Sequence, residues 1–153
     1  MLSLRRITAA LAVAAALLGS SLSADARLVT DHLGREVNVP DTVNRVVTTT
    51  ILPYASVATV FLGGGEKIVG MHPVSMTAAK TGLLSEIYPE VLKANTSFIK
   101  GSSLNIEALM ALKPDVVFVN AGDRNQIEQL ENAGIPALAV SVSKWDYDVL
   151  KTY

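Results

Sequence analysis

The sequence contains no cysteine among its 153 residues. Disulfide bonds, thiolate nucleophiles and cysteine-ligated zinc or iron–sulfur sites are therefore excluded. A bacterial lipoprotein anchor is excluded as well, because it requires a cysteine at the cleavage site. The sequence also lacks a Gly-x-Ser-x-Gly elbow, and no serine has an evident histidine partner. These absences leave covalent catalysis without support.

Histidine is scarce, and the two that occur, His32 and His72, are far apart and not in a metal-binding spacing. We expect His32 to lie in a hairpin turn, exposed to solvent. His72 directly follows a predicted strand, at a position where a ligand can be contacted. We therefore assign His72 as a ligand-binding residue, with direct metal ligation as the weaker alternative, and predict no metal site.

Charge and aromatic content are also low, at 18% and 5% of residues, and the formal net charge is −1. That balance gives no reason to expect binding to nucleic acid or to an acidic membrane surface.

Three of the few aromatic residues lie near predicted strand ends: Tyr54, Trp145 and Tyr147. Aromatic side chains at the rim of a cleft suit a bulky ligand, and the alternative is ordinary half-buried packing. We assign Tyr54 and Trp145 as ligand-binding residues.

The first 26 residues have the features of a cleaved export signal. Arg5 and Arg6 precede an apolar stretch over residues 7–18, and Ala24-Asp25-Ala26 has the small-x-small pattern of a cleavage site. The alternative is a membrane anchor, for which the apolar stretch is too short. The sequence predicts a mature chain that starts at Arg27, lies in the periplasm and is not embedded in the membrane.

The stretch from Leu104 to Val119 is a complete helix-to-strand unit. Asn105 can cap a helix whose apolar residues recur at helical spacing, and Pro114 ends it. The unbroken apolar run over residues 116–119 then fits a strand buried on both faces, as in a parallel sheet. Asn120 begins the loop that leaves the carboxyl end of this strand, where open α/β sheets bind ligands. We therefore assign Asn120 as a ligand-binding residue.

The remaining segments alternate between strand and helix patterns. Residues 28–39 predict a hairpin, residues 45–50, 67–71 and 135–142 predict core strands, and residues 53–62, 76–87 and 124–133 predict helices. The helix over 53–62 is expected to bury Val57, Val60 and Phe61. Right-handed crossovers give a Rossmann-like α/β fold, a parallel sheet with helices on both faces. Gly63-Gly64-Gly65 precedes a strand, the wrong order for a dinucleotide loop, so no cofactor is predicted.

Five segments together resemble the periplasmic solute-binding proteins that serve ABC importers of iron–siderophores, haem and cobalamin. They are VTDHLGREVNVP, RVV, GGGEKIVGM, LNIEALMALKPDVVF and IEQLENAGIPALAV, in that order over residues 29–140. The resemblance implies one α/β lobe of a two-lobed, monomeric binding protein that captures a small-molecule metal chelate and delivers it to an ABC importer permease. It also implies that Glu107, which matches the docking glutamate of the N-terminal lobe, contacts the permease.

The chain has about half the length that the resemblance implies. We expect a signal peptide over 1–26, the N-terminal lobe over 27–142 and the start of a truncated inter-lobe helix over 143–153. An iron complex is the leading substrate, with haem, cobalamin or a nickel or cobalt chelate as alternatives. Two other classes of function are an exported α/β enzyme and a lone lobe that acts as an interaction module.

Overall fold

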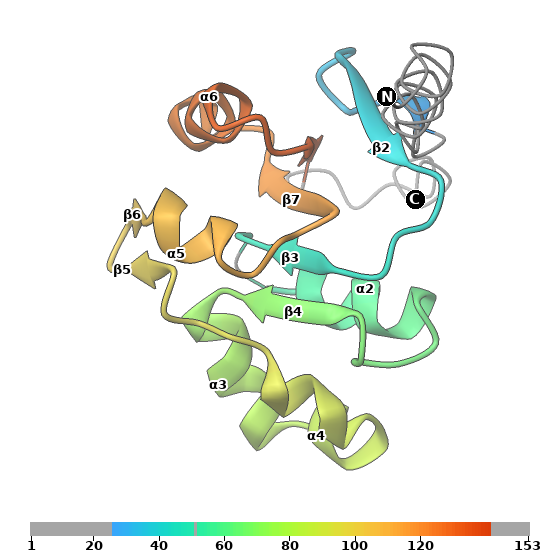
Figure 1. Ribbon diagram of the computed structural model, residues 1–153. Coiled ribbons are helices and arrows are strands. Elements are labelled where there is room, and N and C mark those ends of the chain that lie inside the picture. Colours follow the sequence, from blue (N-terminus) through green and yellow to red (C-terminus); the bar gives the residue numbers. More distant parts are fainter. Residues whose placement is uncertain (1–25, 51, 142–153) are drawn as a thin grey trace, which may run out of the picture.

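A parallel sheet of four strands forms the centre of the molecule (Figure 1). The computed structural model describes residues 26–50 and 52–141. The strands lie in the order β4-β3-β7-β8, so the chain moves outward from β3 first to one side and then to the other. Their bounds are β3 (Val46–Thr48), β4 (Ile68–Met71), β7 (Val116–Asn120) and β8 (Ala137–Val140). All four predicted core strands and the predicted fold class are confirmed.

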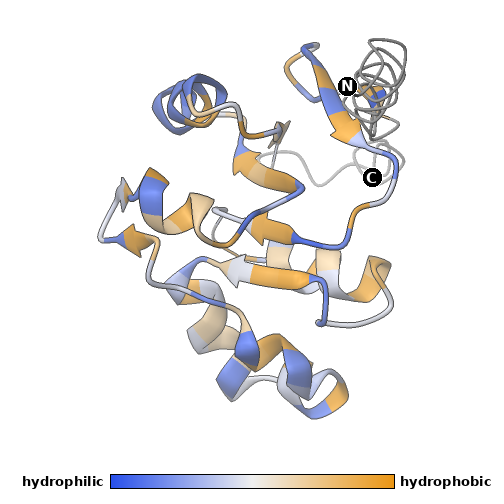
Figure 2. Cartoon of the chain, in the orientation of Figure 1, coloured by the Kyte–Doolittle hydropathy of each residue, from blue (hydrophilic) through white to orange (hydrophobic). Residues whose placement is uncertain are grey.

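Each face of the sheet is covered by a separate set of apolar side chains. Val46 and Val116 pack on one face with helices α2 (Tyr54–Phe61) and α3 (Pro73–Thr81). Val47 and Val117 pack on the other face with α5 (Ile106–Met110) and α6 (Arg124–Asn132). Figure 2 shows the sheet strands largely in hydrophobic colours and α6 largely in hydrophilic ones. Val-rich strands buried on both sides therefore account for the three-layer arrangement.

An antiparallel hairpin precedes the sheet and is fastened to the outer edge of β8. Its strands are β1 (Ala26–Thr30) and β2 (Glu36–Pro40). The amide of His32 donates to Ala139 O at 3.1 Å, and the amide of Ala139 donates to Asp31 Oδ2 at 3.1 Å. The turn was expected to leave His32 in solvent. Instead His32 is half-buried, and its Nδ1 accepts a hydrogen bond from the amide of Ser141 at 2.8 Å.

The helix α5 begins as the sequence predicts. Asn105 is the N-cap, and its Oδ1 accepts a hydrogen bond from the amide of Ala108 at 2.9 Å. Leu109 is fully buried, but Met110, which was expected on the same apolar face, is half exposed. The reason is that α5 has only five residues, too few to hold a full apolar stripe against the sheet.

The buried face of α2 differs from the prediction. Val60 and Phe61 are 58% and 63% exposed, whereas Ala55 and Ala58 are buried. Small side chains allow the helix backbone to approach the sheet closely, so close packing rather than side-chain hydrophobicity selects the buried face. The expectation that Val60 and Phe61 are core residues was therefore wrong.

The segment between β4 and α5 is more broken than the sequence indicated. The single helix predicted over 76–87 starts earlier, at Pro73, and is interrupted by extended backbone at Gly82. A second short helix, α4 (Leu84–Ile87), a 3₁₀ turn, η1 (Pro89–Lys93), and a two-stranded hairpin follow. The hairpin strands are β5 (Ile99–Lys100) and β6 (Ser103–Leu104). This hairpin directly follows the buried Phe98.

Candidate functional site

An open cleft of about 560 Å³ lies at the carboxyl ends of the central strands. β3 has β4 on one side and β7 on the other, so the loops after β3 and β7 leave in opposite directions. Open α/β sheets bind ligands at such a topological switch point. The residues that line the cleft come from the ends of β3, β4 and β7, the β5–β6 turn and the start of α6: Thr49, Thr50, Leu52, His72, Ile99, Gly101, Ser102, Asn120, Gly122, Asp123 and Gln126.

His72 reaches the cleft from the end of β4. It is the N-cap of α3, and its Nδ1 accepts a hydrogen bond from the amide of Val74 at 3.1 Å. Burial lowers the pKa of His72 below its usual value. Since Nδ1 acts as an acceptor, the neutral ring carries its proton on Nε2. His72 can therefore offer a single Nε2–H donor to a ligand while it caps the helix.

Asn120 reaches the cleft from the end of β7, as the sequence predicted. Its Oδ1 accepts a hydrogen bond from the amide of Gly122 at 2.8 Å, which shapes the turn into α6. Asp123 is the N-cap of α6, and its Oδ1 accepts a hydrogen bond from the amide of Gln126 at 3.0 Å. The Asn120 oxygen is thus used by the loop, and its Nδ2 amide group is the part that can donate to a ligand.

Two further residues of the cleft, Thr50 and Gln126, were not identified from the sequence. Thr50 is 3% exposed, and its Oγ1 has no hydrogen-bond partner among the described residues. Oε1 of Gln126 is also buried and also has no hydrogen-bond partner among those residues. A buried polar group without a partner costs about 1–3 kcal/mol, so each such group calls for an explanation. A signal for Thr50 was present, because the apolar strand at residues 46–47 changes to three threonines at its carboxyl end.

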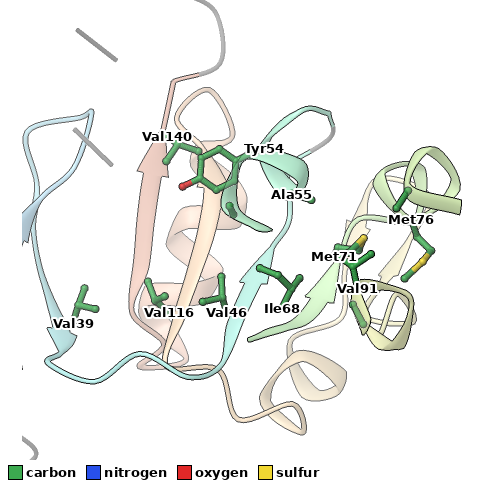
Figure 3. Packing of buried hydrophobic residues seen from close by; sticks show 13 residues of the cluster. Val39, Val46, Tyr54, Ala55, Ile68, Met71, Met76, Val91, Val116 and Val140 are labelled. Carbon is green, nitrogen blue, oxygen red and sulfur yellow. The ribbon is translucent and has the colours of Figure 1, made fainter. Parts of the chain in front are cut away.

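Tyr54 is not in this cleft. Its side chain is 5% exposed and packs against Phe118, with ring centroids 4.9 Å apart. Figure 3 shows it above the sheet face, near Val140. It lines a separate, mainly apolar cavity of about 280 Å³ between the hairpin, α2 and the sheet. The structure therefore brings His72 and Asn120 together but places Tyr54 in the hydrophobic core. Trp145 lies outside the described residues, as do residues 1–25 and the predicted final helix.

Glu107 is exposed in the first turn of α5. This turn directly follows the β5–β6 hairpin, whose Gly101 and Ser102 line the cleft. Glu107 therefore lies toward the carboxyl edge of the sheet, on the side of the molecule that carries the cleft. Its position agrees with the expectation that the side chain faces solvent.

The chemistry of the cleft is that of a hydrogen-bonding site with few charges. Among the lining residues in the described part of the chain, Asp123 is the one charged side chain at neutral pH, and that carboxylate already accepts a hydrogen bond from its own helix. Within residues 26–50 and 52–141, no group of three or more metal-ligating side chains is found. No helix in those ranges is long and apolar enough to cross a membrane. What the cleft offers is a set of hydroxyl, imidazole and amide groups around an open space.

Known proteins match both the sequence and this arrangement. The sequence is 35% identical to the molybdate-binding protein MolA of Haemophilus influenzae over 130 residues, which are 80% of this chain and 35% of MolA. A periplasmic solute-binding protein from Veillonella parvula superimposes with a TM-score of 0.75 at 26% identity, covering 84% of this chain and 38% of its own. The chain has the fold of one lobe of a solute-binding protein.

A second solved structure supports the same match. MolA bound to molybdate, described as the cognate binding protein of an ABC transporter, superimposes with a TM-score of 0.62 at 32% identity. It covers 82% of this chain and 37% of its own. No protein-family model matches the chain. The chain thus spans little more than a third of the length of these relatives, which are solute-binding proteins.

Proposed function

We propose that this protein is the periplasmic solute-binding component of an ABC importer and that the cleft at the switch point is one wall of its solute site. The observation that carries the proposal is the cleft itself, because it lies where open α/β sheets bind ligands and the fold is that of one binding-protein lobe. His72 and Asn120 contact the solute from this wall. The protein binds its solute, carries out no catalysis and works as a monomer in the periplasm.

The partner in this proposal is the importer permease. Glu107 is exposed on the side of the molecule that carries the cleft. A glutamate there can meet a basic pocket of the permease while the solute is held nearby, and such charge complementarity speeds and orients docking. Residue Glu107 is accordingly the docking residue of this lobe.

The solute is the part of the proposal for which two chemistries compete. The resemblance seen in the sequence implies an iron complex of the siderophore type, with haem, cobalamin or a nickel or cobalt chelate as alternatives. The relative MolA binds molybdate, which favours an oxyanion. In either case the site takes a small soluble molecule that a permease can accept.

Uptake measurements test the function. In a strain that lacks the gene for this chain, we expect the accumulation of one labelled solute, molybdate or a ferric chelate, to fall to background. Returning the gene should restore that uptake, and the uptake of an unrelated nutrient such as an amino acid should not change. Unaltered accumulation of every metal complex and oxyanion tried would contradict the importer assignment.

A further inference from the structure

We infer that the cleft is built for a small tetrahedral oxyanion and that Thr50 is one of the residues that hold it. The inference rests on the proposed solute-binding function and adds the class of solute. It is carried by the side chains of the cleft and by the two helices that begin there.

Thr50 supplies the first argument. The residue is 3% exposed, lines the cleft, and its hydroxyl has no partner among the described residues. A threonine hydroxyl always carries a donor, and leaving that donor buried and unpaired is costly. An oxyanion presents acceptor oxygens on every side. Binding one would therefore satisfy the Thr50 hydroxyl with a charge-assisted hydrogen bond.

The second argument is the convergence of two helix starts. α3 and α6 each have nine residues, and their N-caps, His72 and Asp123, both line the cleft. The amino end of a helix carries a partial positive charge, which stabilises an anion without a cationic side chain. This accounts for a site in which the lining residues that the structure describes include neither lysine nor arginine.

The remaining side chains fit the same ligand. The Nε2–H of His72 is a donor, because Nδ1 accepts from the amide of Val74. The Nδ2 group of Asn120 is a donor, because its Oδ1 accepts from Gly122. Gln126 Oε1 is buried without a partner, and a half-turn of that amide puts its Nε2–H donors at the same place. Donors therefore come from β3, β4, β7 and α6 around one space.

The same list argues against a bare metal ion and against haem. A hard cation needs several carboxylates, whereas the one carboxylate among the described lining residues, Asp123, already accepts from the amide of Gln126. Within residues 26–50 and 52–141, the lining contains no tyrosine, tryptophan or phenylalanine to stack on a porphyrin. Tyr54, the aromatic residue expected there, is packed against Phe118 in the core.

Titration of the full chain, labelled with ¹⁵N and followed by NMR, tests the inference. The probes are sodium molybdate, sodium tungstate and a gallium(III) hydroxamate complex, which is a diamagnetic substitute for a ferric chelate. We expect molybdate and tungstate at millimolar concentrations to shift the amide signals of Thr50, Asn120 and Gln126. We expect the gallium complex to leave those signals in place.

Two matched variants make the test specific to Thr50. Thr48 lies two residues earlier, is also fully buried with an unpaired Oγ1, and does not line the cleft. Thr50→Val should weaken molybdate binding by about tenfold or more, because it removes one charge-assisted hydrogen bond. Thr48→Val removes an equivalent hydroxyl from the same strand and should bind molybdate like the unaltered chain.

Three outcomes would overturn the inference. The first is no shift in the cleft with either oxyanion, and the second is equal weakening by Thr48→Val and Thr50→Val. The third is that the gallium complex, and not molybdate, shifts the cleft signals. That third result would still support the solute-binding function, so the two proposals fail separately. If molybdate shifts the cleft signals but deletion of the gene leaves the uptake of every solute unaltered, the oxyanion inference stands and the transport function fails.

Discussion

At the scale of single residues, Asp31 contributes most to joining the hairpin to the sheet. Its side chain is almost fully buried and accepts hydrogen bonds from the amides of Leu33 and Ala139, and from Arg35 Nε at 2.9 Å. Arg35 in turn donates to Ala137 O and pairs with Glu131 of α6. One carboxylate thus shapes the turn and fastens it to β8.

Asp31→Asn tests this role through the dependence of stability on pH. Burial alone would raise the pKa of the Asp31 carboxyl, but the hydrogen bonds from Arg35 and Ala139 outweigh it and lower that pKa. A lowered pKa in the folded state stabilises the fold above the unfolded value of about 3.9, and this contribution is lost as the pH falls through the folded value. At pH 7 the variant should be destabilised by about 2 kcal/mol.

Urea unfolding at a series of pH values measures this effect. The difference in unfolding free energy between the unaltered chain and Asp31→Asn should be largest near neutral pH and shrink below about pH 4. Asp41→Asn is the matched control, since Asp41 is exposed, and its stability should stay close to that of the unaltered chain. A difference that does not change with pH would show that the Asp31 charge is not what holds the hairpin.

The sequence predicted part of this arrangement. Asp31 and Gly34 have turn chemistry between two alternating runs, so the hairpin itself could be expected. The contacts to Ala139 and Glu131 could not, because they join residues about a hundred positions apart and depend on where the hairpin docks. His32 was assigned to solvent for the same reason.

At the scale of elements, the strands were easier to predict than the helix faces. β7 contains an unbroken apolar run, and β3 consists of two valines and a threonine, all β-branched. Such sequences leave little choice of structure in a parallel sheet. In α2 the hydrophobic pattern pointed to Val57, Val60 and Phe61, whereas close packing selected Ala55 and Ala58. Which face of a short helix approaches the sheet depends on tertiary fit, which the pattern of one segment does not contain.

The cap of α3 gives a prediction at this scale. Burial lowers the pKa of His72, and the sign follows from linkage: stability is complete above the unfolded value of about 6.5 and falls as the pH drops below it. Protonation of Nδ1 also removes the acceptor for the Val74 amide. Asparagine is a good N-cap that does not titrate. His72→Asn should therefore reduce the fall in melting temperature between pH 7 and pH 5.5.

Melting curves across that pH range, recorded by circular dichroism, measure the difference. His72→Ala is the useful comparison, since it removes both the titration and the cap and should be less stable than His72→Asn by about 1 kcal/mol at every pH. If His72→Asn melts with the same pH dependence as the unaltered chain, another group is responsible for the acid sensitivity.

At the scale of the whole molecule, the order of the strands determines where the site lies. The rule that loops meet at the carboxyl ends of parallel strands was enough to predict that His72 and Asn120 share one wall. The sheet order was not needed for that prediction, but it is what puts Thr50 between them. Tyr54 follows the same strand end as Thr50, yet the turn into α2 directs its ring to the sheet face. A few backbone angles in one loop therefore separate a residue of the cleft from a residue of the core.

The last prediction concerns the surface proposed to meet the permease. Glu107 is exposed and follows the capping residue Asn105, so we expect neither folding nor solute binding to depend on its charge. We expect Glu107→Ala to leave the melting temperature and the affinity for solute nearly unchanged while it slows uptake. Glu107→Arg should reduce uptake further, because it sets like charges against each other at the docking surface.

Uptake into vesicles that contain the cognate permease, measured beside a solute titration of each variant, tests this docking role. Glu66 provides the matched control: it is also exposed, but it precedes β4 and therefore lies at the opposite edge of the sheet. Glu66→Arg makes the same change in net charge and should transport like the unaltered protein, which separates docking from a general charge effect. Equal uptake with Glu107→Arg and Glu66→Arg would mean that Glu107 serves only the start of its helix.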